Sequence, residues 1–270
     1  MTKQLKDMTW QEAKKAFEII KLGIIPTGSI EQHGPHLPLG TDFMIAEYLA
    51  NKVSEKVDSI ITPTIPIGFA AYHQDFEGTL SVPPDVLTSY YQSVADSLVL
   101  YGVTHILFIN GHGGNANSLS AVCRNLRDRG VTSAFIQWWQ IAGELNDKWS
   151  MIGHGDISET SMMLAISGNN VRLEKAAVPT NKWLTDKVQM TDRTTCKFGP
   201  GLINTFFRTG DISETGDFIE YGHSSKADYS KSPAEATAEN GQEILDVMIN
   251  YIVDFIHEFK KIHFKPAEKN

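Results

Sequence analysis

The feature that most constrains the fold is the stretch HILFINGHGGNANSLSAVCRNLRDRG, residues 105–130. An apolar run ends in a glycine-rich turn, and a segment with helical character follows without a break. A strand, a tight turn and a helix in succession form the repeating unit of sheets whose parallel strands are connected by helices. The stretch therefore predicts an α/β fold.

The same alternation continues through most of the chain. Compact apolar runs predict strands, and apolar residues that recur every three or four positions predict helices. Strands are expected at 22–26, 59–67, 105–110 and 131–139, and helices at 9–20, from 42 onward, at 85–101, 118–130 and 159–166, and from 232 onward. Turn-rich tracts in residues 168–231 predict loops and short strands. We expect one domain over residues 1–270, with a mostly parallel sheet flanked by helices on both faces.

Cap residues predict where three of these helices begin. Thr9 and Glu12 have the spacing of a capping box, and so do Ser232 and Glu235 at the start of the last helix. Asp42 precedes an apolar stripe and is the expected N-cap of its own helix.

Composition narrows the class of protein. An apolar fraction of 41% and a charged fraction of 21% are typical of a globular protein with a large core. A formal net charge of −8 argues against a nucleic-acid partner. Two cysteines are too few for a disulfide scaffold, and no apolar stretch suits a signal peptide or a membrane span. We expect a cytoplasmic protein without a membrane partner.

The loop that follows the first predicted strand carries potential metal ligands. Glu31 and His33 are two residues apart, so on extended backbone they project to the same side. Asp42 lies eleven residues after Glu31, across a loop rich in glycine and proline that can fold back. Glu31 as a solvated acid and Asp42 as a helix cap are the alternatives.

His112 strengthens the metal hypothesis, because it stands between glycines directly after a strand. Ligands collect beyond the carboxyl ends of parallel strands, where both this turn and the Glu31 loop are expected to lie. A histidine with carboxylates from separate loops suits Zn, Mn or Fe, and a carboxylate that bridges two ions is the arrangement that activates water. The alternative is a phosphate cradle, although GHGGN matches neither common phosphate-binding glycine motif.

Five motifs in the same order resemble the creatininase family of metal-dependent amidohydrolases. They are GSIEQHGPHLPLGTD, GFAAYHQDFEGTLS, FINGHGGN, HGDISETSMM and ATAENG. The resemblance covers most of the chain, and its glycine turn is of the NGHGGN type rather than that of creatininase proper. It implies a single α/β domain, two divalent metal ions per subunit (Zn, Mn or Fe) and assembly into a homohexamer.

The resemblance also implies a ligand set. Glu31, Asp42 and His112 would hold one ion, while His33 and the bridging Asp42 would hold the other.

One departure affects the second ion. Creatininases proper have a glutamate two residues after the ligand histidine, which completes the second ion's shell and takes part in catalysis, whereas this chain has Gly114. The resemblance implies that Glu159 of the HGDISETS motif supplies the carboxylate instead. His154 of the same motif would transfer a proton or contact the substrate.

Further residues are candidates for substrate contact. His73 matches a histidine of the family's long loop, and Tyr72 replaces a glutamate that often precedes it. Trp138 and Trp139 close a predicted strand near the position of tryptophans that cover the substrate in creatininases, and Asn115 ends the glycine turn. Loop packing for the first pair and core packing for the tryptophans are the alternatives.

These observations predict a metal-dependent hydrolase in which metal-activated water opens a small cyclic amide or cleaves a formamide C–N bond. Two alternatives remain. The same water could cleave a C–C bond of a cyclic diketone, such as a keto-inositol of the 3-dehydro-scyllo-inosose type. The protein could also bind a metal or small molecule without turnover.

Overall fold

A parallel sheet lies at the centre of the molecule. The computed structural model describes residues 4–150, 153–176, 178–179, 181–191, 194–220 and 228–267. Four parallel strands lie in the order β2-β1-β3-β4, with bounds Ile60–Ile61, Leu22–Thr27, His105–Asn110 and Thr132–Gln137. The predicted mixed α/β fold is confirmed. Within the described residues no helix is both long and apolar enough to cross a membrane.

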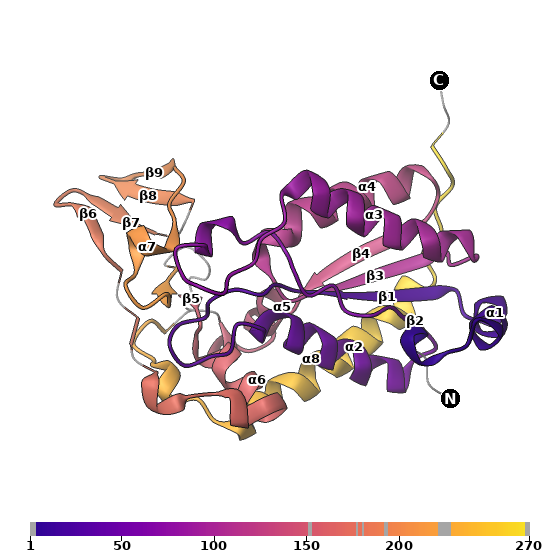
Figure 1. Ribbon diagram of the computed structural model, residues 1–270, viewed down its shortest axis with the longest axis horizontal. Helices are drawn as coiled ribbons and strands as arrows, with labels where there is room; N and C mark the ends of the chain where they lie inside the picture. The colour runs from indigo at the N-terminus through magenta and orange to yellow at the C-terminus, as the bar shows by residue number, and fades with distance from the viewer. Residues whose placement is uncertain are drawn as a thin grey trace.

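Helices cover both faces of the sheet, as Figure 1 shows. On one face lie α1 (Trp10–Ile19), α3 (Pro84–Leu100) and α4 (Ala116–Asp128), and on the other lie α2 (Thr41–Lys56), α5 (Trp138–Leu145), α6 (Ile157–Ser167) and α8 (Ala238–Phe259). Successive strand residues point to opposite faces, so Ile24 joins the core under α2 and α8 and Ile25 joins the core under α3 and α4. Burial on both faces explains the continuous apolar runs of β1 and β3.

Two of the predicted helix starts need correction. The capping box at Thr9 is present. Helix α2, however, has Gly40 as its N-cap, so Asp42 lies inside the first turn. The capping box at Ser232 caps only a single 3-10 turn, because the backbone is extended again at Ala236. Helix α8 begins at Ala238, with Thr237 as its N-cap.

Several other boundaries differ from the prediction, and the strand expected at 59–67 is only Ile60–Ile61. The strand expected at 131–139 ends at Gln137, and Trp138 and Trp139 are instead the first residues of α5. Helix α6 begins two residues before the expected position, behind Asp156, whose side chain accepts hydrogen bonds from the backbone N–H groups of Ser158 and Glu159.

A small antiparallel lobe occupies much of the region expected to contain loops and short strands. Its strands lie in the order β6-β7-β8-β9, with bounds Trp183–Thr185, Val188–Met190, Thr195–Phe198 and Gly201–Asn204. The chain returns through α7 (Thr209–Ile212), and β10 (Phe218–Ile219) pairs with β5 (Gly153–His154). Figure 1 shows the lobe at the side of the molecule that carries β5. Residues 221–227 of this region lie outside the described residues.

Candidate metal centre

Five potential ligands meet beyond the carboxyl ends of β1 and β3. They come from the loop after β1, the start of α2, the turn after β3 and the start of α6, and each is between 1% and 5% exposed; they are Glu31, His33, Asp42, His112 and Glu159. Close backbone contact brings these segments together, since a Cβ on Gly111 would lie 2.1 Å from the Asp42 carbonyl oxygen. Only glycine allows the turn after β3 to approach α2 so closely.

The first group has the spacing of ligands around one ion. His112 Nδ1 lies 3.2 Å from Glu31 Oε2 and 3.0 Å from Asp42 Oδ2. Tetrahedral ligands about 2.0–2.1 Å from an ion are about 3.4 Å apart. Both oxygens are buried and neither makes a hydrogen bond of good geometry with a described residue. Such oxygens are costly unless a cation compensates them, so the donor set fits a divalent metal ion.

A second group shares Asp42 with the first. His33 Nε2 lies 2.8 Å from Asp42 Oδ1 and 3.9 Å from Glu159 Oε1. His33 and Glu159 form a second potential ligand group together with His154. Asp42 thus directs one oxygen to each group, which is the geometry of a bridging carboxylate.

Backbone carbonyls orient both imidazoles of these groups. His33 Nδ1 donates to the carbonyl of Glu31 at 3.1 Å, and His112 Nε2 donates to the carbonyl of Phe69 at 2.8 Å. The lone pair of each neutral ring therefore lies on the nitrogen that faces the carboxylates. Metal-binding histidines in proteins are generally held in this way.

The carboxylates dominate the protonation of the metal-free centre. Burial alone would lower the pKa of His33, but the nearby carboxylates, Asp42 first, raise it to about 10. The pKa of His112 is likewise raised against the effect of burial, chiefly by Glu31. Burial raises the pKa of Glu159 to about 8, with His33 opposing. Metal binding at these imidazoles must therefore release protons.

Gly114 occupies the position where creatininases proper have a glutamate, and the space beside it is filled. A Cβ there would lie 2.1 Å from the Phe69 carbonyl oxygen and 2.5 Å from the Tyr72 hydroxyl oxygen. The Tyr72 hydroxyl itself lies 3.3 Å from His112 Nε2. Tyr72 and Gly114 are therefore sterically matched, and no side chain at 114 can complete the second group.

The remaining predicted substrate contacts have structural partners. The Asn115 side chain donates to the carbonyl of Gly28 and accepts from the backbone N–H of Phe69, which ties two loops together. Trp138 is 1% exposed in the core beneath α2 and α8, while Trp139, 7% exposed, approaches Gly113. Substrate contact by these residues stays a prediction.

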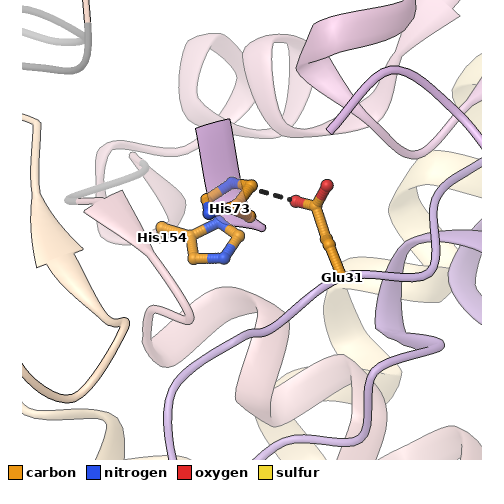
Figure 2. Close-up of side chains that lie close together, drawn as sticks. All are labelled: Glu31, His73 and His154. Carbon is orange, nitrogen blue, oxygen red and sulfur yellow. Dashed lines mark ion pairs between the residues drawn. The ribbon is translucent and has the colours of Figure 1, made fainter. Parts of the chain in front are cut away.

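His73 and His154 lie next to Glu31 of the first group, as Figure 2 shows. His73 Nε2 is 3.3 Å from Glu31 Oε1, and the rings of His73 and His154 stack at 4.4 Å between centroids. The Nε2 of His154 donates to the carbonyl of Gln32.

Sequence reasoning missed three residues that shape this site: Gln32, Asp156 and Thr209. Asp156 had a usable signal, because an aspartate three residues before Glu159 at a helix start is typical of an N-cap. Gln32 and Thr209 contact His73 across the fold, at separations of 41 and 136 residues, and no local pattern marks them.

Known proteins match this chain over most of its length. The model of the creatininase family, creatinine amidohydrolase, matches residues 6–256. The mycofactocin precursor peptide peptidase of Mycolicibacterium smegmatis is 27% identical over 256 residues, which cover 92% of this chain and 89% of the relative. The creatinine amidohydrolase of Pseudomonas putida is 26% identical over 193 residues, or 63% of this chain and 74% of the relative. A solved manganese creatininase has the same fold, with a TM-score of 0.73, 21% identity and coverage of 96% and 98%.

The chain belongs to the creatininase family. It is a metal-dependent hydrolase that binds divalent metal, and the alternative of a binding protein without turnover is set aside.

Proposed function

We propose that this chain hydrolyses an amide C–N bond with two divalent ions, Zn, Mn or Fe. Glu31, Asp42 and His112 would hold one ion, and His33, Asp42 and Glu159 the other. Bound there, the ions would polarise a carbonyl and lower the pKa of water enough to make it a nucleophile at neutral pH. The observation that carries the proposal is the convergence of two buried carboxylate oxygens, Glu31 Oε2 and Asp42 Oδ2, within 3.2 Å and 3.0 Å of His112 Nδ1.

Two side chains are suited to move the proton that amide cleavage requires. In the metal-free centre burial raises the pKa of Glu159 to about 8, and its Oε2 accepts a hydrogen bond from the N–H of Gly155. His154 donates through Nε2 to a carbonyl, so the lone pair of its neutral ring is on Nδ1. We assign proton transfer to the leaving nitrogen to Glu159 or His154.

The two relatives compared above support an amide substrate, whereas a 3-dehydro-scyllo-inosose hydrolase of Thermotoga maritima, 31% identical over 107 residues, keeps C–C cleavage as the second candidate. The names peptidase and amidohydrolase both describe C–N cleavage, in a precursor peptide and in creatinine. We propose a small cyclic amide, a formamide or a peptide amide for this chain. Creatinine itself is disfavoured, because Gly114 lacks the glutamate that creatininases proper have at that position.

A turnover screen tests the proposal. Protein stripped of metal and reloaded with Zn, Mn or Fe is offered cyclic amides, N-formyl compounds, short peptides and keto-inositols. We expect amide hydrolysis that disappears on chelation and returns on reloading. A Glu31→Ala, His112→Ala double variant is the control, with circular dichroism to verify folding. Full turnover by a folded, metal-free double variant would contradict the proposal, and turnover of keto-inositols alone would replace it with C–C cleavage.

We also propose that the chain assembles with copies of itself, as a hexamer by family resemblance. Large apolar side chains of α1 and α3 line one surface hollow, with Trp10 74%, Tyr90 52% and Tyr101 57% exposed. Contiguous apolar surface of this kind is typical of protein–protein contacts. Light scattering should give the mass of six chains, and a monomeric mass would contradict the assembly.

A further inference from the structure

Glu31, His73 and His154 have the composition and spacing of a third metal site, with ligand atoms within 4.8 Å of one another (Figure 2). All three side chains are at least 95% buried. Whether His73 can be a ligand depends on which of its nitrogens carries the proton, because only a lone pair binds a metal. The groups that contact Nδ1 decide this question.

The amide of Gln32 has only one orientation that fits its surroundings. Its Oε1 accepts a hydrogen bond from the N–H of Gly34 at 3.0 Å, and its Nε2 donates to the carbonyl of Gly216 at 2.9 Å. Both partners are backbone groups with fixed roles, so a flipped amide would place donor against donor and acceptor against acceptor. The second hydrogen of Nε2 is therefore left for His73 Nδ1, 2.9 Å away.

This contact fixes the tautomer of His73. Because Gln32 presents an N–H, Nδ1 must accept, and the Thr209 hydroxyl, 2.6 Å from the same nitrogen, can donate to it as well. The proton of the neutral ring then lies on Nε2, which faces Glu31 Oε1 at 3.3 Å. The opposite tautomer would set N–H against N–H at Gln32 and a lone pair against a carboxylate at Glu31.

His73 thus differs from the two histidines of the candidate metal centre. His33 and His112 each donate their outer N–H to a backbone carbonyl, which leaves a lone pair toward the carboxylates. The Nδ1 of His73 instead faces two donors, Gln32 and Thr209, so its Nε2 directs an N–H toward the Glu31 carboxylate. We propose that Gln32 holds His73 as an Nε2–H donor to Glu31 Oε1, so that Glu31 offers only Oε2 to the metal and His73 is a positioning residue, not a ligand.

The second half of this proposal, that Glu31 offers a single oxygen to the metal, rests on the metal centre of the proposed function. Hydrogen bonds to ligating carboxylates typically change metal affinity about 10–100-fold when they are removed. Replacing the Gln32 donor by an acceptor, in Gln32→Glu, should draw the proton of His73 to Nδ1 and weaken zinc binding by about 10-fold or more. Gln11→Glu makes the same chemical change on exposed α1 and is the matched control.

Nitrogen-15 NMR of histidine-labelled protein reads the tautomer directly. The His73 resonances are identified by their loss in His73→Gln, in metal-free and zinc-loaded protein. We expect an Nε2–H ring in both states, conversion toward Nδ1–H in Gln32→Glu, and no change in Gln11→Glu. Zinc affinity is measured beside it by competition with a chromophoric chelator.

The outcomes separate this inference from the proposed function. An Nδ1–H ring in the wild type, or a His73 Nε2 resonance shifted by zinc as a ligand's would be, overturns the inference. Equal zinc affinity in Gln32→Glu and Gln11→Glu overturns the positioning role. Failure of the wild type to bind zinc, manganese or iron overturns the proposed function, while the tautomer of the metal-free protein is still decided by the spectrum.

Discussion

Asp42 is the residue on which the candidate metal centre depends most. One of its oxygens lies against His33 and the other against His112, and the side chain is 3% exposed. Its position inside the first turn of α2, instead of at the cap, is what directs the carboxylate inward. The charge of His33 lowers the pKa of Asp42 against the effect of burial, so the carboxylate is ionised.

Asp42→Asn should reduce metal binding at both positions. The amide keeps the shape of the side chain but loses the negative charge and one of the two ligand oxygens. Removing a residue that only hydrogen-bonds to a ligand weakens metal binding by up to about 100-fold. Because Asp42 would itself be a ligand, we expect zinc affinity to fall by at least about 100-fold. Elemental analysis and chelator competition measure the effect. Asp96→Asn, at the exposed pair with Arg129, is the control, and equal metal content in both variants would refute the role of Asp42.

Two neighbouring glycines allow a matched steric test. At Gly114 a Cβ would lie 2.1 Å from the Phe69 carbonyl oxygen, whereas at Gly113 the nearest atom, on Trp139, is 3.9 Å away. Gly114→Ala should therefore lower the free energy of unfolding by about 1–3 kcal/mol, the usual cost of overpacking. Gly113→Ala should leave it nearly unchanged. Urea denaturation measures both variants, and equal midpoints would contradict the packing described for this turn.

At the scale of elements, the start of α6 connects helix stability to the site. Asp156 accepts from the backbone N–H groups of Ser158 and Glu159, and Glu159 Oε2 accepts from the N–H of Gly155. The cap and the candidate ligand therefore share one turn of backbone. Distortion of that turn moves the Glu159 carboxylate.

Asp156→Ala should lower the free energy of unfolding by about 0.5–2 kcal/mol, because the first turn of α6 loses its cap. Asp156→Asn keeps an acceptor oxygen at the same place and should lose less. Chemical denaturation compares the two variants. If both were equally destabilised, charge and not capping would be the function of Asp156.

Much at this scale follows from local sequence, and some does not. The Thr9 capping box and the apolar runs of β1 and β3 were predictable because their signals lie within a few residues. The four-stranded lobe was not, because strands of three or four residues have too little periodicity to distinguish from loops.

At the scale of the molecule, the residues after α8 run along the edge of the sheet where β3 and β4 begin. The carbonyl of Ile262 accepts from His105 Nε2 at 2.9 Å and from the Thr132 hydroxyl at 3.0 Å. His105 Nδ1 is 2.9 Å from the Thr104 hydroxyl, which can donate to it. Both nitrogens of a neutral His105 thus have hydrogen-bond partners, and it is burial, not the contact with the tail, that favours the uncharged ring.

The burial of His105 predicts a pH dependence of stability. Burial lowers the pKa of His105, the Ile262 carbonyl opposes it, and the positive charges of His263 and Lys260 add to the lowering. The unfolded chain, whose histidine pKa is about 6.5, then binds a proton more readily than the folded chain. The contribution of His105 is complete above that pH and is lost as the pH falls through the folded pKa. Urea midpoints from pH 8 to pH 5 should fall more in the wild type than in His105→Gln. Parallel curves would contradict the assignment.

The sequence by itself determined the class of fold, because the alternation of apolar runs with helical stripes is local and is dictated by burial on both faces of a parallel sheet. It also marked Glu31, His33, Asp42 and His112 as potential ligands, because strand ends of such a sheet meet at one edge. Only the tertiary structure decided how each residue is presented. Three features depend on atoms distant in sequence: Asp42 directs one oxygen to His33 and the other to His112, Phe69 and Tyr72 fill the space beside Gly114, and Gln32 donates to His73 Nδ1. Hydrogen-bond direction and close packing are set by those partners, and no local pattern records them.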